Sequence, residues 1–82
     1  MKEVTYTRAA IRVLRRMPAN IASRIERKVS EYAADPAALA NNVTALKGRE
    51  AVRLRVGDWR IIMHDGVVLT ILEVGPRGDI YD

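Results

Sequence analysis

Hydrophobic and polar residues alternate strictly over residues 52–56, the segment Val-Arg-Leu-Arg-Val. Successive side chains of a strand point to opposite faces, so this alternation predicts a strand with three aliphatic side chains on one face. The guanidiniums of Arg53 and Arg55 occupy the other face. Residues 57–58, Gly-Asp, predict a tight turn, and residues 59–64, Trp-Arg-Ile-Ile-Met-His, predict a second strand. The chain is organised around this predicted hairpin.

The second strand of the hairpin adds a third arginine to the polar face. On a regular strand Arg60 shares a face with Ile62 and His64. If the register allows, the hairpin gathers Arg53, Arg55 and Arg60 on one surface. Such a cluster suits a phosphate-bearing partner, because the planar fork of a guanidinium matches two phosphate oxygens.

Two segments before the hairpin carry hydrophobic residues at helical spacing. The first predicted helix covers residues 8–16, with Thr7 as its N-cap, and the second covers residues 19–34. The residues predicted to be buried are Ala10, Ile11, Leu14 and Met17 in the first helix, and Ile21, Ile25, Val29 and Tyr32 in the second. Because only Met17-Pro18 links the helices, they form an antiparallel hairpin, and Asp35-Pro36 ends it.

The remaining segments complete a two-layer fold. Residues 1–6 predict a short strand, residues 36–50 a connector with a helical turn, and residues 67–74 a central strand that is apolar on both faces apart from Thr70 and Glu73. The predicted order is β-α-α-β-β-β. We therefore expect one α+β domain over residues 1–82, with a mostly antiparallel sheet covered on one face by the helical hairpin. The other face is partly open and carries the arginines.

The composition gives the protein a positive charge and argues against some kinds of chemical site. Fourteen basic residues, eleven of them arginine, give a formal net charge of +4, which favours nucleic acid as a partner. Arg8, Arg12 and Arg16 follow at helical spacing and form either a solvated face or a surface for RNA or an acidic protein. The chain has one histidine and no cysteine, which excludes disulfides and argues against a dedicated zinc site. With no signal pattern or long apolar run, we expect a cytoplasmic protein that does not bind membranes.

Several short motifs, in this order and spacing, resemble the RelE/ParE superfamily of bacterial type II toxins, which are encoded beside an antitoxin. They are Leu46-Lys47-Gly48 before the hairpin, residues 53–60 within it, and Val74-Gly75-Pro76-Arg77 with Tyr81 at the end of the chain. The resemblance covers nearly the whole chain and implies the same α+β fold.

The two branches of this superfamily act on different targets. The RelE-like branch cleaves messenger RNA in the ribosomal A site, whereas the ParE-like branch poisons DNA gyrase without nuclease residues. The RelE-like pattern has two alternating basic residues, an aromatic-arginine pair, a late arginine and a C-terminal tyrosine. The matching residues here are Arg53, Arg55, Trp59, Arg60, Arg77 and Tyr81. The resemblance therefore implies a ribosome-dependent endoribonuclease that inhibits translation, with a gyrase inhibitor or an inactive antitoxin-binding homologue as alternatives.

The resemblance also assigns roles to individual residues. The catalytic candidates are Arg55, Arg60, Arg77 and Tyr81, and the RNA-binding candidates are Lys47, Arg49, Arg53 and His64. Relatives often have lysine at positions 53 and 55, and arginine cannot replace lysine as a general base because it stays protonated. The base is therefore either another group, such as His64, Glu50 or Glu73, or is dispensable. The glutamates can equally pair with arginine.

The resemblance implies no cofactor and no metal. The partners that it implies are a cognate antitoxin, the ribosome and mRNA, with toxin and antitoxin forming a hetero-oligomer. An acidic, partly disordered antitoxin segment would suit the basic face of the first helix and the open sheet edge.

Overall fold

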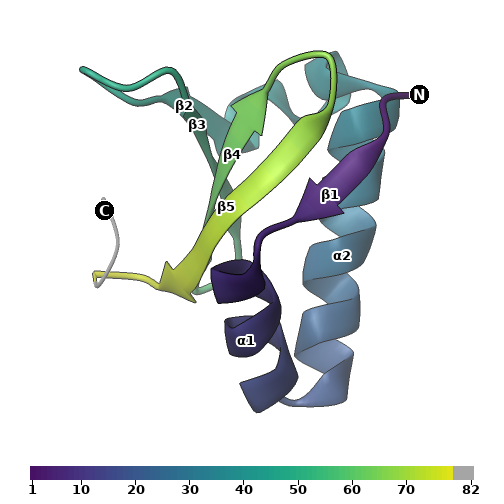
Figure 1. Ribbon diagram of the computed structural model, residues 1–82, viewed down its shortest axis with the longest axis vertical. Helices are drawn as coiled ribbons and strands as arrows, with labels where there is room; N and C mark the ends of the chain where they lie inside the picture. The colour runs from purple at the N-terminus through teal and green to yellow at the C-terminus, as the bar shows by residue number, and fades with distance from the viewer. Residues whose placement is uncertain (79–82) are drawn as a thin grey trace.

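The chain folds into two layers, a five-stranded sheet and a pair of helices on one of its faces (Figure 1). This computed structural model describes residues 1–78. The elements are β1 (Val4–Tyr6), α1 (Arg8–Arg16), α2 (Ala19–Ala34), the 3-10 helix η1 (Pro36–Asn42), β2 (Val43–Ala45), β3 (Val52–Val56), β4 (Trp59–Asp65) and β5 (Leu69–Pro76). The predicted α+β class is confirmed.

The sheet is mixed, with the strand order β1-β5-β4-β3-β2. β1 pairs with β5 in parallel, and every other pair is antiparallel. The prediction that the last strand is central was wrong, because β4 occupies the middle and β5 lies between β4 and β1. The connector over residues 36–50 contains one strand more than expected, since residues 43–45 pair with the start of β3.

Local sequence signals explain where the helices begin and end. The Thr7 hydroxyl accepts a hydrogen bond from the Ala10 backbone N–H at 3.2 Å and donates one to the Leu72 carbonyl at 2.8 Å. Thr7 therefore caps α1 and also fastens it to β5. Pro36 follows the Asp35 cap that ends α2. Both helices have the predicted bounds.

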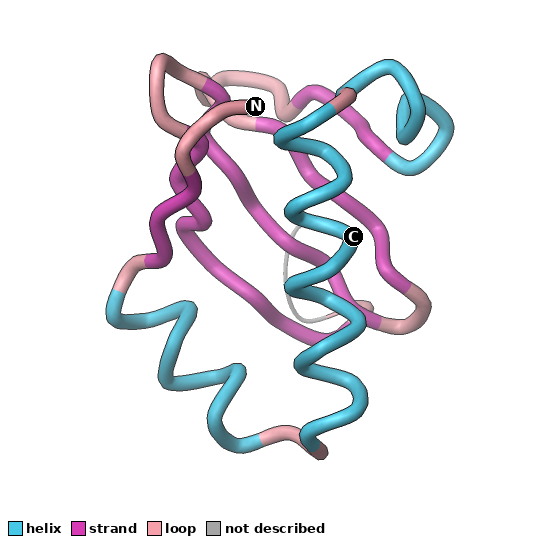
Figure 2. Tube along the Cα trace, turned by 90° about the vertical axis from the view of Figure 1, so that its right-hand side faces the viewer, coloured by secondary structure: helices cyan, strands magenta, loops and turns pink. Residues whose placement is uncertain are grey.

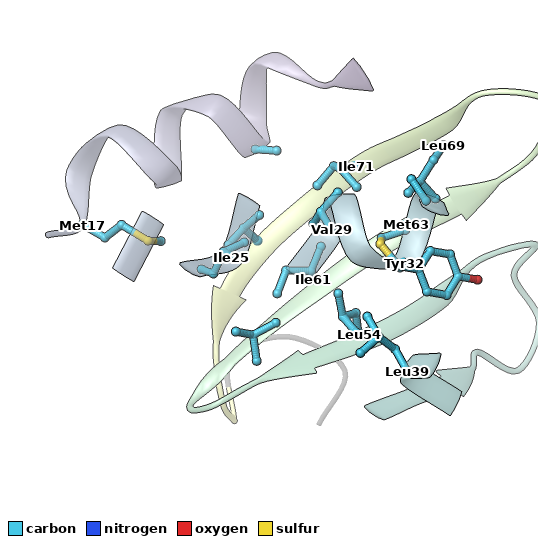
Figure 3. Close-up of a cluster of buried hydrophobic side chains, with 14 residues drawn as sticks. Met17, Ile25, Val29, Tyr32, Leu39, Leu54, Ile61, Met63, Leu69 and Ile71 are labelled. Carbon is cyan, nitrogen blue, oxygen red and sulfur yellow. The ribbon is translucent and has the colours of Figure 1, made fainter. Parts of the chain in front are cut away.

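The core lies between the helices and the sheet face that carries the aliphatic side chains of β3 (Figure 3). Ile25 and Val29 of α2 contribute fully buried side chains, and Leu54, Ile61 and Met63 meet them from the sheet. The prediction for Ile11 was wrong, because its side chain is 38% exposed. It borders a hollow between α1 and α2 instead of the core.

Candidate nucleic-acid interface

The sheet face opposite the helices gathers the three arginines of the hairpin. In the register of β3 and β4, Arg55 lies directly opposite Arg60, and Arg53 lies opposite Ile62. Their strand neighbours Leu54 and Ile61 pair with each other on the helix side and are buried there. Figure 2 shows α2 in front of the sheet, so the arginine-bearing face is turned away from the viewer. The predicted clustering of the three arginines is confirmed.

The Arg60 side chain is held in place by the β3–β4 turn. Only 7% of Arg60 is exposed, and its Nη1 donates to the carbonyls of Gly57 at 3.1 Å and Trp59 at 3.2 Å. Gly57 has φ of +58°, a conformation that glycine adopts at little cost, so the turn can be this tight. A positive charge therefore lies opposite the exposed Arg55 on the neighbouring strand.

Arg77 joins this end of the sheet through its backbone. Its N–H donates to the Asp58 carbonyl at 2.7 Å, and the preceding Pro76 pairs with Trp59. Arg55, Arg60 and Arg77, three of the four predicted catalytic residues, therefore lie around the β3–β4 turn. The fourth, Tyr81, lies outside the described residues.

Other predicted RNA-binding residues lie at the opposite end of the same strands. Arg49 and His64 border a hollow of about 280 Å³ beside the β2–β3 loop, and Lys47 is exposed in that loop. His64 is four residues from Arg60 along β4, which is roughly 13 Å at the ~3.3 Å rise of a strand. The structure therefore separates His64 from the β3–β4 turn rather than bringing them together.

Between the two ends, an ion pair spans the open face. Arg49 Nη1 lies 3.3 Å from Glu73 Oε2, and Glu73 pairs across the sheet with Ile62. Ile62 is fully buried although it faces away from the helices. The β4–β5 register shifts between Ile62 and Met63. The residue that Glu73 faces therefore depends on the register of this pair and cannot be found from residues 67–74 alone.

Arg24 of α2 is not among the candidate residues that the sequence indicated. A Cβ built on Gly57 would lie 3.5 Å from Arg24 Nη1, so this guanidinium lies against the β3–β4 turn. No local pattern in the sequence marks this contact, because it depends on how α2 crosses β3.

The clearest pKa shifts belong to groups away from the arginine cluster. Burial, followed by a hydrogen bond to Asp65 and its charge, raises the pKa of Tyr32 to about 12. Tyr32 donates to Asp65 Oδ2 at 2.8 Å, and the hydrogen bond from Lys2 is the main reason that the pKa of Asp65 is lowered. Burial and the charge of Glu26 raise the pKa of Tyr6 to about 12. These groups tie together β1, α2 and the end of β4.

The described residues contain neither a metal-binding cluster nor a helix that could span a membrane. Within residues 1–78, no group of three or more His, Cys, Asp or Glu side chains is arranged to hold a metal ion. In the same part of the chain, neither α1 nor α2 combines the length and the apolar character needed to cross a membrane.

Solved structures with the same fold come from archaea and bacteria. The RelE–RelB complex of Pyrococcus horikoshii OT3 matches with a TM-score of 0.77 and 24% identity, over 95% of this chain and 97% of that one. The RelB–RelE antitoxin–toxin complex of Methanococcus jannaschii matches with a TM-score of 0.73 and 24% identity, over 95% of each chain. Isolated Escherichia coli RelE matches with a TM-score of 0.76 and 15% identity, over 99% of this chain and 89% of that one. At these identities the likeness establishes the fold.

Sequence comparison establishes the family. None of the curated protein sequences compared with the chain matches it. A family model described as the ParE toxin of the type II toxin–antitoxin system parDE matches residues 4–81, nearly the whole chain. The chain therefore belongs to the ParE toxin family of type II toxin–antitoxin systems, within the RelE/ParE superfamily.

Proposed function

We propose that this toxin is a ribosome-dependent endoribonuclease that cleaves messenger RNA and is neutralised by a cognate antitoxin. The observation that carries the proposal is the direct pairing of Arg55 with Arg60 on the face that the helices leave uncovered. Arg55 offers its N–H donors to the oxygens of a phosphate on this face, the buried guanidinium of Arg60 adds a positive charge opposite it, and Arg53 lies on the same face.

The reaction uses a nucleophile that RNA itself supplies. The 2′-oxygen attacks the adjacent phosphorus, the bond from phosphorus to the 5′-oxygen breaks, and the products are a 2′,3′-cyclic phosphate and a 5′-hydroxyl. One proton leaves the 2′-hydroxyl and one reaches the 5′-oxygen. The protein has to align the two oxygens and stabilise the negative charge on the phosphorane.

The three arginines near the β3–β4 turn suit different parts of this task. Arg55 is exposed and suits direct contact with the non-bridging oxygens. Arg60 is fixed by two carbonyls and acts as a preorganised charge, which avoids reorganisation during the reaction. Arg77 adds a third cation beside the turn. A well-placed donor of this kind is worth about 3 kcal/mol of transition-state stabilisation.

Proton transfer is not assigned to an arginine. Because His64 lies roughly 13 Å along the strand from Arg60, it is too far for direct transfer at a phosphate bound there. We assign His64, Lys47, Arg49 and Arg53 to RNA binding, and Tyr81 to proton exchange or base stacking by resemblance. Catalysis then depends mainly on positioning and electrostatics.

The test is translation of one defined mRNA in vitro with the purified protein, read by primer extension. We expect cuts spaced by codons that appear only when ribosomes are present. Arg55→Ala should abolish the cuts while leaving the fold intact, whereas the control Arg27→Ala, on the exposed side of α2, should cleave like the wild type. Intact mRNA with wild-type protein, or equal cleavage by Arg55→Ala, would refute the proposal.

Gyrase inhibition is the second candidate function, and the match to the ParE toxin family favours it. A ParE-like toxin would block DNA supercoiling by gyrase. Because such a toxin has no catalytic site, substitution of Arg55 should not remove a catalytic group from it. A supercoiling assay with purified gyrase therefore separates the two candidates. If both assays are negative, an inactive homologue that binds only its antitoxin is the best account.

The antitoxin is proposed to bind the helical side of the molecule. The RelE proteins of Pyrococcus horikoshii and Methanococcus jannaschii were solved in complex with RelB. In this chain α1 carries four exposed arginines, at positions 8, 12, 15 and 16, beside a hollow lined by Tyr6, Ile11 and Leu14. An acidic amphipathic segment matches both the charge and the apolar character. Co-purification with the product of the neighbouring gene should give a complex that survives moderate salt, and failure to do so would count against this partner.

A further inference from the structure

A groove runs between α2 and the edge of β3, behind the arginine-bearing face. It consists of two adjoining hollows of about 190 Å³ and 60 Å³ that share Arg24, Val56 and Gly57. Lys28 and Arg55 also line the smaller hollow. We call this surface the α2–β3 groove. Arg55 lines the smaller hollow and also lies on the arginine-bearing face of the sheet.

The groove exists because β2 is too short to cover β3. β2 pairs only with residues 52–54, so Arg55 and Val56 extend beyond the point where β2 begins. The chain preceding β2 turns away as η1, and Asn42 Nδ2 reaches the Arg55 carbonyl at 3.4 Å. The last two residues of β3 therefore have no neighbouring strand on this side.

The charges that line the smaller hollow are all positive. In the described part of the chain, the guanidiniums of Arg24 and Arg55 have no hydrogen-bond or ion-pair partner, whereas Lys28 lies 3.0 Å from Glu31. Asp58 borders only the larger hollow. An anion would therefore be held best in the smaller hollow. The apolar residues that also line this hollow, Leu39, Leu54 and Val56, are at most 9% exposed, so the charged side chains provide the contacts for a ligand.

We propose that the α2–β3 groove binds the phosphodiester backbone of single-stranded RNA next to the segment held on the arginine-bearing face. Arg55 belongs to both surfaces, so one strand can pass around the edge of β3 from Arg60 towards Arg24 and Lys28. This proposal rests on the proposed function only in taking RNA as the ligand. The groove supplies affinity and orientation, and the reacting phosphate stays near Arg55 and Arg60.

The test is fluorescence anisotropy with a short labelled single-stranded RNA, titrated with the full chain at several salt concentrations. Arg24→Gln is compared with Arg27→Gln, a matched loss of one charge from another exposed position of α2. Because an ion contact with a single strand contributes about 0.7 to the slope of log affinity against log salt, Arg24→Gln should lower that slope by about 0.7. It should also weaken binding by about fivefold at low salt. Arg27→Gln should bind like the wild type.

The outcomes distinguish the groove from the proposed reaction. Equal affinity and slope for Arg24→Gln and Arg27→Gln would overturn the groove, even if the wild type cleaves mRNA during translation. A selective loss with Arg24→Gln would support the groove, even if no mRNA cleavage is found. Circular dichroism of both variants checks that the helices are intact, and Lys28→Gln provides a second variant, for which we expect a smaller loss because Glu31 shares its charge.

Discussion

Replacing Tyr32 by phenylalanine should destabilise the protein by an amount that depends on pH. Tyr32 is only 6% exposed, and its hydroxyl donates to Asp65 Oδ2 at 2.8 Å. Its pKa is raised from 10.0 to about 12, and each unit corresponds to about 1.4 kcal/mol. The shift therefore limits the pH-dependent part of the stability difference to about 2.7 kcal/mol. Because burial is the largest cause of the shift, the contribution at neutral pH is taken instead from the hydrogen bond to the charged Asp65, about 2 kcal/mol.

The sign of the pH dependence follows from the direction of the shift. The folded state holds the phenolic proton more tightly than the unfolded state, so this stabilisation is fully present below pH 10 and is lost as the pH rises towards 12. The stability difference between the wild type and Tyr32→Phe should thus be about 2 kcal/mol at neutral pH and shrink above pH 10. The raised pKa of Tyr6 is common to both proteins and cancels in the difference.

Urea unfolding of both proteins at several pH values, followed by the fluorescence of the single tryptophan, Trp59, measures this difference directly. A stability difference that stays constant from neutral pH to pH 12 would show that the hydroxyl does not interact with Asp65 in the folded state. A difference near zero at neutral pH would show that the network does not stabilise the fold.

Further predictions concern the core, the α1 cap and the ion pair. Leu54→Ala removes a side chain that is 1% exposed and should cost about 3 kcal/mol in thermal or urea unfolding, whereas Val67→Ala, at a position 94% exposed, should change stability by less than about 0.5 kcal/mol. Thr7→Ala removes both the cap of α1 and the bond to Leu72, and should cost about 1–2 kcal/mol with reduced helical dichroism. Asp65→Asn should matter most above the usual carboxyl pKa and least in acid, because the folded-state pKa of Asp65 is lowered and its stabilisation disappears as the pH falls through that value. Arg49→Ala breaks a half-exposed pair with Glu73 and should cost less than about 1 kcal/mol in urea, so a larger loss would contradict the exposure seen for this pair.

The fold was predictable where each residue's environment is set locally. The alternation over residues 52–56 and the Gly57-Asp58 turn determine which side chains of the hairpin share a face, and the structure has that arrangement. The helix bounds follow from Thr7 and from Asp35-Pro36, which act within one turn. The strand order and β2 were not predictable in this way, because a three-residue strand depends on its partner β3 rather than on its own sequence.

The candidate site was predictable in part for the same reason. Hairpin register brings Arg55 next to Arg60, but only tertiary packing brings Arg24 to Gly57 and Arg49 to Glu73. The burial of Arg60 also escaped the sequence pattern. Its position on the polar face suggested exposure, whereas the turn carbonyls bind its guanidinium against the sheet.

The pairing of Arg55 with Arg60 opposes stability, which is why it points to function. Like charges directly opposite each other on a sheet are destabilising, and the β3–β4 register places two guanidiniums at such positions. The carbonyls of Gly57 and Trp59 offset the charge of Arg60, but no partner offsets that of Arg55 within residues 1–78. Local rules are broken most often at functional sites, where a ligand supplies what the fold lacks. A phosphate bound at this position would neutralise the repulsion, so the arrangement that weakens the free protein strengthens its complex with a polyanion.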